Sequence, residues 1–109
     1  MGQKLSKPDL ALYRAVDEVL HYVWDPIGVS LQPEARDEYH GYLPQVFRLL
    51  REGADESKIA AYLTSVTTER MGLSPRTDHD IEVACLLLAW KQSIARSNLA
   101  FQPTASGGG

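Results

Sequence analysis

The sequence predicts an all-α protein, a single four-helix bundle-like domain. Three segments carry apolar residues on one helical stripe, at spacings of three and four residues. A fourth segment is apolar on nearly every side, and the alternating pattern of a β-strand is almost absent. The chain of 109 residues has room for one such domain.

The first helix is predicted over residues 8–23, after a flexible lead formed by residues 1–7. Pro8 suits the first helical turn, because that turn does not need the N–H that proline lacks. The apolar stripe of this segment comprises Leu12, Val16, Val19, Leu20 and Val23. This stripe predicts a helix that buries one face against the rest of the domain.

A turn is predicted directly after the first helix, at the WDPIG motif of residues 24–28. A residue before proline avoids the α conformation, so Asp25 is not expected to continue the helix. Pro26 and Gly28 favour a turn, and Trp24 is expected to pack into the core beneath it. Asp25 is expected to accept backbone N–H bonds within the turn or to cap the next helix.

The second helix is predicted over residues 33–52, with Tyr39 on its core stripe. Pro44 interrupts this segment, because proline removes a backbone hydrogen bond and kinks a helix. We favour one helix kinked at Pro44 over a new helix that begins there. A new helix would have Leu43 as a poor N-cap and would leave Tyr39 without a role.

Two further helices complete the predicted domain, over residues 55–71 and 78–96. Asp55 is expected to cap the former. Thr77 and Asp80 resemble a capping box at the start of the latter. Both helices therefore have a polar start signal next to an apolar segment.

The segment over residues 78–96 is apolar all round, which predicts either a central helix or a helix with one face covered by a second subunit. Trp90 is accordingly expected to be a core anchor. Cys85 lies in the same apolar run and is expected to be a small core residue.

The helical domain is predicted to cover residues 8–97, followed by a disordered tail over residues 98–109. The tail has no apolar periodicity and ends in three glycines. Its LAFQPTASGG segment resembles the translated edge of an integron recombination site. That resemblance implies a gene carried on a mobile cassette.

Composition and motifs argue against several function classes. The net charge of −3 and the scattered basic residues disfavour nucleic-acid binding. No apolar run is long enough to span a membrane, and the single cysteine fits a reducing cytoplasm. Asp17 and His21 share a helix face but have no matching pair of metal ligands elsewhere. We expect a cytoplasmic protein without a metal, a cofactor or a catalytic motif.

An acidic cluster near the WDPIG turn is the predicted contact surface. Asp25, Asp37 and Glu38 would lie at one end of the bundle and face a protein partner, while Tyr39 would be structural. The leading hypothesis is therefore a non-enzymatic protein-interaction module. A homodimer through residues 78–96 is a further hypothesis, because a second copy would cover the apolar helix.

The alternative is a small-ligand-binding protein or a small enzyme with a pocket between its helices. His21, Glu69 or Arg70 would give such a pocket its polarity. The aromatic residues that could line it are Tyr13, Tyr22, Tyr39, Tyr62 and Trp90.

One family resemblance rests on the WDPIG motif, the DEY tripeptide of residues 37–39 and the LPxxFxLL pattern of residues 43–50. Together these pieces resemble a family of short bacterial proteins of unknown function, over residues 12–95. The resemblance implies an all-helical cytoplasmic protein without an assigned activity. Such proteins resemble in style the immunity-type proteins that accompany bacterial toxins, so an immunity or antitoxin role is the specific form of the interaction hypothesis.

Overall fold

The protein is all-helical, as predicted. The computed structural model describes residues 5–100, and side chains over residues 5–97, without a strand in that part of the chain. Single π-helical turns extend the first helix over Leu20–Trp24 and the third over Val66–Arg70. The four helices are α1 (Lys7–Val19), α2 (Leu43–Arg51), α3 (Glu56–Ser65) and α4 (Thr77–Ala100).

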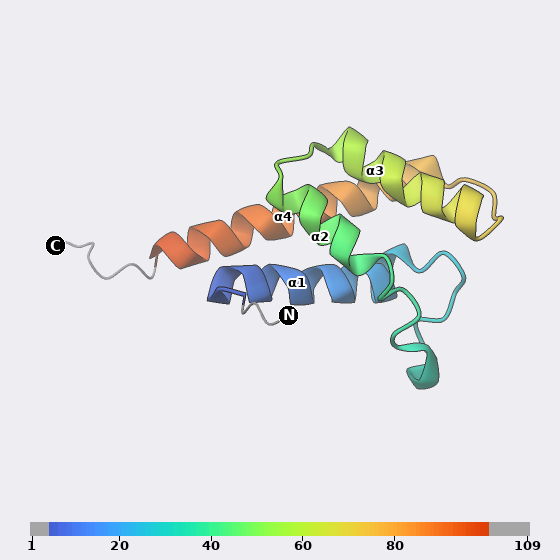
Figure 1. Ribbon diagram of the computed structural model, residues 1–109, viewed down its shortest axis with the longest axis horizontal. Helices are drawn as coiled ribbons and strands as arrows, with labels where there is room; N and C mark the ends of the chain where they lie inside the picture. Colours follow the sequence, from blue (N-terminus) through green and yellow to red (C-terminus); the bar gives the residue numbers. More distant parts are fainter. Residues whose placement is uncertain (1–4, 101–109) are drawn as a thin grey trace, which may run out of the picture.

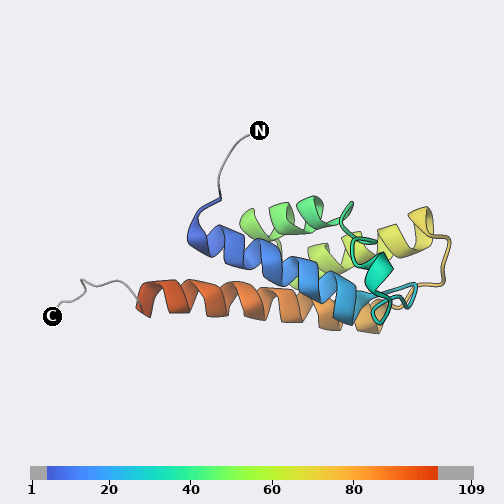
Figure 2. The ribbon, with the colours of Figure 1, turned by 90° about the horizontal axis from the view of Figure 1, so that it is seen from below.

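Helices α1 and α4 lie side by side and run in opposite directions (Figure 1). Helices α2 and α3 cover one side of this pair, as Figure 2 shows. The core lies between the two layers, and all four helices contribute to it. Its largest fully buried side chains are Trp24, Tyr39, Leu20, Leu50, Ile59, Leu63 and Leu87.

Local chemistry explains where two helices begin. The Ser6 hydroxyl accepts a hydrogen bond from the Asp9 backbone N–H at 3.3 Å, and Pro8 lies in the first turn of α1. Asp55 caps α3, as predicted, because its carboxylate accepts a bond from the Lys58 N–H at 3.0 Å. These caps satisfy N–H groups that have no partner within their helix.

The second helix is much shorter than predicted, and Pro44 is the reason. The single kinked helix over residues 33–52 is wrong: a 3₁₀ turn occupies Pro33–Ala35, further turns follow, and α2 begins at Leu43. Pro44 lies in the first turn of α2, where its missing N–H costs nothing. The chain before Pro44 therefore forms a loop, which brings Tyr39 back onto the WDPIG turn.

Helix α4 has one buried side, in contrast to the central position that its composition allowed. Val83, Ala84 and Leu87 are fully buried against the other helices. Trp90, expected to be a core anchor, is 44% exposed, and Cys85, expected in the core, is exposed as well. Among residues 5–97, an apolar side of α4 is thus left without cover from the other helices.

The described residues extend slightly beyond the predicted domain of residues 8–97. Helix α4 continues to Ala100, three residues past that limit and into the predicted tail. The remaining part of the predicted tail, residues 101–109, and residues 1–4 of the predicted lead lie outside the described residues.

Candidate functional site

Trp24 connects three helices through one buried carboxylate. Its side chain is 1% exposed, and its indole Nε1–H donates to Asp80 Oδ1 at 3.0 Å. The Thr64 hydroxyl of α3 donates to the other oxygen of Asp80 at 2.8 Å. Asp80 lies in the first turn of α4, where the helix dipole favours a negative charge. This arrangement makes Trp24 a structural residue and leaves it unavailable to a partner.

Asp25 closes the turn that follows Trp24. Its backbone is in the left-handed region, at a φ of 34°, which aspartate tolerates better than most residues. Its carboxylate accepts bonds from the Val29 N–H at 2.8 Å, the Ser30 N–H at 3.1 Å and the Tyr39 hydroxyl at 2.7 Å. Asp25 therefore faces into its own loop, where its carboxylate accepts hydrogen bonds from three donors of the same chain.

Tyr39 is the buried partner of this turn. Its ring is 2% exposed and lies 5.4 Å from the Trp24 ring, centroid to centroid. Its hydroxyl donates to Asp25 and accepts a bond from the Ile27 N–H at 3.2 Å. Burial raises the pKa of the Tyr39 hydroxyl above its ordinary value, and the bond to Asp25 raises the pKa further. Tyr39 therefore stays neutral and serves as a fixed hydrogen-bond donor.

Pro26 and Gly28 shape the backbone of the WDPIG turn. Pro26 is partly buried, and Gly28 is exposed with a φ of 72°, a conformation that favours glycine. The Gly28 N–H donates to the Asp25 carbonyl at 3.2 Å, which completes the turn.

Asp25 makes the stability of the protein sensitive to acid. Burial raises the pKa of its carboxyl, but the bonds from Tyr39, Val29 and Ser30 outweigh burial, so the pKa lies below the ordinary 3.8. Around pH 3.8 and below, the Asp25 carboxyl therefore binds a proton more readily in the unfolded chain than in the folded chain. Acid thus favours unfolding in this range. We expect urea midpoints to drop over that acid range, and Asp25→Asn to flatten the drop. The variant Asp37→Asn, at an exposed position outside this network, should keep the wild-type pH dependence.

The acidic cluster predicted as a contact surface is smaller than expected. Asp37 and Glu38 are exposed in the loop before α2, while Asp25 is engaged as described. The structure thus brings the three acids near one turn but leaves two of them facing solvent.

The loop before α2 is tied to α1 by a second polar cluster. Arg36 donates to both oxygens of Asp17, at 2.9 and 3.1 Å, and His40 Nε2 lies 3.0 Å from Asp17 Oδ1. His21, the predicted neighbour of Asp17, is instead buried with its Nε2 3.2 Å from the Ser30 carbonyl oxygen. Asp17 and His21 therefore do not converge, and no group of three potential metal ligands occurs among the described residues.

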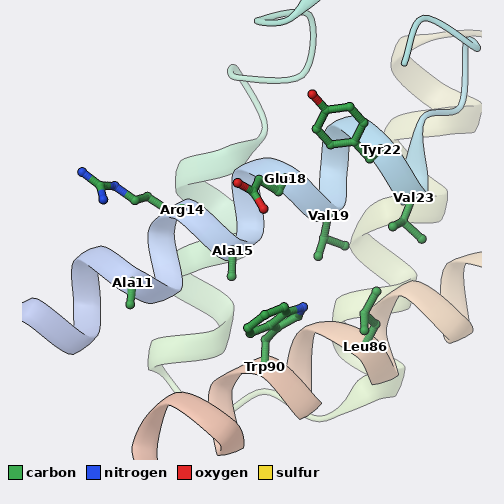
Figure 3. A pocket seen from close by; sticks show the side chains of 9 residues that line it. All are labelled: Ala11, Arg14, Ala15, Glu18, Val19, Tyr22, Val23, Leu86 and Trp90. Carbon is green, nitrogen blue, oxygen red and sulfur yellow. The ribbon is translucent and has the colours of Figure 1, made fainter. Parts of the chain in front are cut away.

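A groove of about 430 Å³ runs between α1 and α4, on the side away from α2 and α3 (Figure 3). Its floor is apolar, with Ala15, Val19 and Leu86. Tyr22, 56% exposed, lies at its α1 edge, and the Trp90 ring lies between α4 and Ala15 (Figure 3). The remaining lining residues are Ala11, Arg14, Glu18 and Val23. We call this surface the α1–α4 face.

The α1–α4 face differs from a second groove, of about 580 Å³, between α3 and α4. That groove is lined mainly by small and hydroxyl side chains. Three of its hydroxyls are used inside the chain. Thr64 donates to Asp80, and Ser65 and Thr68 each donate to a backbone carbonyl of α3. Of these two grooves, the α1–α4 face combines exposed aromatic rings with an apolar floor, a composition that is common at protein contact surfaces.

The predicted pocket between the helices does not form from the residues expected to line it. Tyr39 and His21 are buried in the core. Tyr13 packs edge-to-face on Phe47 at 5.1 Å, and Tyr62 lies partly buried against the core. Of the predicted aromatic lining, Tyr22 and Trp90 alone border the α1–α4 groove, and the groove is open along one side.

No protein-family model, curated protein or solved structure was found to match this chain. The resemblance to short bacterial proteins, the cassette origin and the cytoplasmic location therefore stay predictions. Among the described residues, no helix is both long enough and apolar enough to cross a membrane.

Proposed function

We propose that this protein is a non-enzymatic interaction module that binds a protein helix in the α1–α4 face. The observation that carries the proposal is the exposure of Trp90 and Tyr22 beside an apolar groove. Large exposed aromatic residues are over-represented among the residues that dominate binding energy at interfaces. An isolated exposed aromatic ring needs no explanation, but two rings that border one groove indicate a contact surface.

The shape of the groove favours a helix as the bound element. The groove follows two antiparallel helices, so an amphipathic helix laid along it would extend the bundle by one helix. Ala11 and Ala15 have short side chains on the α1 side of the groove, so the backbone of a bound helix can come close to α1 there. Arg14 and Glu18 border the same groove with opposite charges. The occupant that fits is therefore a helix with an apolar stripe flanked by one acid and one base.

Affinity capture with three baits tests this proposal against the acidic surface predicted from the sequence. We expect a protein that wild type recovers to be lost with Trp90→Ser and retained with the double variant Asp37→Asn/Glu38→Gln. With the recovered protein purified, Trp90→Ser should raise the Kd about thirtyfold or more, as for a central aromatic contact.

The opposite pattern would contradict the proposal. If the double acid variant loses the partner while Trp90→Ser retains it, the contact surface is the acidic loop. If instead a small molecule stabilises wild type but not Trp90→Ser against heat, the groove is a ligand site.

A further inference from the structure

We propose that a second copy of this chain binds the outer side of α4, the side turned away from the core, in a two-fold dimer whose α4 helices run antiparallel. Figure 2 shows α4 along one edge of the molecule, with the other helices on one side of it. Its outer side carries the exposed residues Asp78, Ile81, Glu82, Cys85, Ala89, Gln92, Ser93 and Arg96. Because these positions recur at spacings of three and four residues, they form one continuous stripe along the helix.

The outer side of α4 is separate from the α1–α4 face. Trp90 directly follows Ala89, and successive residues of an α-helix point about 100° apart. The Trp90 ring therefore lies toward α1 (Figure 3), whereas none of the residues of the outer side lines the α1–α4 groove. The inference thus goes beyond the proposed function and does not depend on it.

The charges on the outer side of α4 match a copy of themselves. Asp78 and Arg96 are 18 residues apart, or about five helical turns, so they lie on one line along the helix. Within residues 5–97 neither side chain forms an ion pair. A two-fold axis midway between them sets Asp78 of each copy opposite the partner's Arg96. The same axis sets Glu82 opposite the partner's Gln92, so like charges do not face each other.

The centre of the stripe fits the same axis. Cys85 and Ala89 lie at equal distances on either side of the midpoint between Asp78 and Arg96, so each Cys85 faces the partner's Ala89. Side chains this short allow two helix axes to approach to about 8 Å. Ile81, which is 45% exposed, borders this centre and would lose contact with water. Opposite charges at equal distances from one midpoint are what a two-fold contact requires, so a second copy fits this surface.

Sedimentation equilibrium of the purified full-length chain tests this inference. We expect wild type to be dimeric at micromolar concentration. Ala89→Glu should raise the dimer Kd about thirtyfold or more, because it places two carboxylates at the centre of the contact. Asp78→Arg alone and Arg96→Asp alone should each raise the Kd about tenfold, because each change places like charges together at two symmetric points. The double variant Asp78→Arg/Arg96→Asp should return the Kd to near the wild-type value, since the pairs are restored with their signs exchanged.

Ala61→Glu and Lys58→Asp are the matched controls, because they make the same charge changes at exposed positions on α3. Both should leave the Kd unchanged, and circular dichroism should show that every variant keeps its helix content. A wild-type chain that stays monomeric at high micromolar concentration would overturn this inference and leave the proposed function standing. Additive weakening in the double variant would also overturn it. So would a dimer that is lost with Trp90→Ser and kept with Ala89→Glu.

Discussion

Replacing Trp24 by alanine is expected to lower the free energy of unfolding by about 3–5 kcal/mol, the usual cost of removing a large buried aromatic side chain. The same change also takes away one of the two side-chain donors to Asp80, and that carboxylate is 1% exposed. Because domains of this size have a total stability of about 5–15 kcal/mol, Trp24→Ala should come close to unfolding the protein. Urea denaturation at low protein concentration, followed by circular dichroism, measures the loss.

Two further variants separate the contributions of Trp24. Trp24→Phe keeps most of the ring but removes the N–H, so it should cost about 1.5–3 kcal/mol, the range for a hydrogen bond to a charged group. Trp90→Ala removes the same side chain from a half-exposed position and should cost about 1 kcal/mol or less. Equal costs for Trp24→Ala and Trp90→Ala would contradict the assignment of Trp24 as the internal anchor.

Replacing Asp80 by alanine is expected to cost about 2–3 kcal/mol. The substitution leaves the Trp24 indole N–H and the Thr64 hydroxyl without their acceptor in a buried position. It also removes a negative charge from the first turn of α4, where the helix dipole stabilises that charge by a few tenths of a kcal/mol.

Asp78→Ala is the control for the dipole, because Asp78 is an exposed acid in the same first turn. It should cost about 0.5 kcal/mol or less. If chemical denaturation gives the same loss for both alanine variants, Asp80 acts through its charge alone and does not hold α3 and the Trp24 turn together.

Helix positions were predictable from the sequence where the signals are local. The apolar stripe of α1, the Asp55 cap and the proline-containing turn after Trp24 each depend on residues within about one or two helical turns of each other. The order and approximate extent of three helices follow from such signals.

The loop before α2 was not predictable in the same way, because a distant contact decides it. Tyr39 has a helical spacing to Leu43, which favours a helix through both residues. In the structure its hydroxyl bonds instead to Asp25, 14 residues earlier. That bond also removes Asp25 from the acidic surface that the sequence suggested, since the composition of a cluster does not show which carboxylates are used internally.

The α1–α4 face was not predictable from the sequence for a different reason. Periodicity shows which side of an amphipathic helix is buried. Because α4 is apolar on both sides, its periodicity does not show which side is buried. Trp90 could therefore not be separated from residues such as Leu87, which is fully buried. One feature of the sequence did indicate a contact surface. A helix that is apolar all round needs contacts on every side, and three short helices cannot provide them all.

The two tryptophans of the chain allow one direct measurement of the proposed division between anchor and contact surface. Fluorine NMR of protein labelled with 5-fluorotryptophan gives one resonance for each ring, and Trp90→Phe assigns them. We predict that the Trp90 resonance moves when a protein recovered by affinity capture is added, while the Trp24 resonance stays fixed. A Trp90 resonance that stays fixed when the captured protein is added would contradict the proposal that the α1–α4 face is a protein-binding surface.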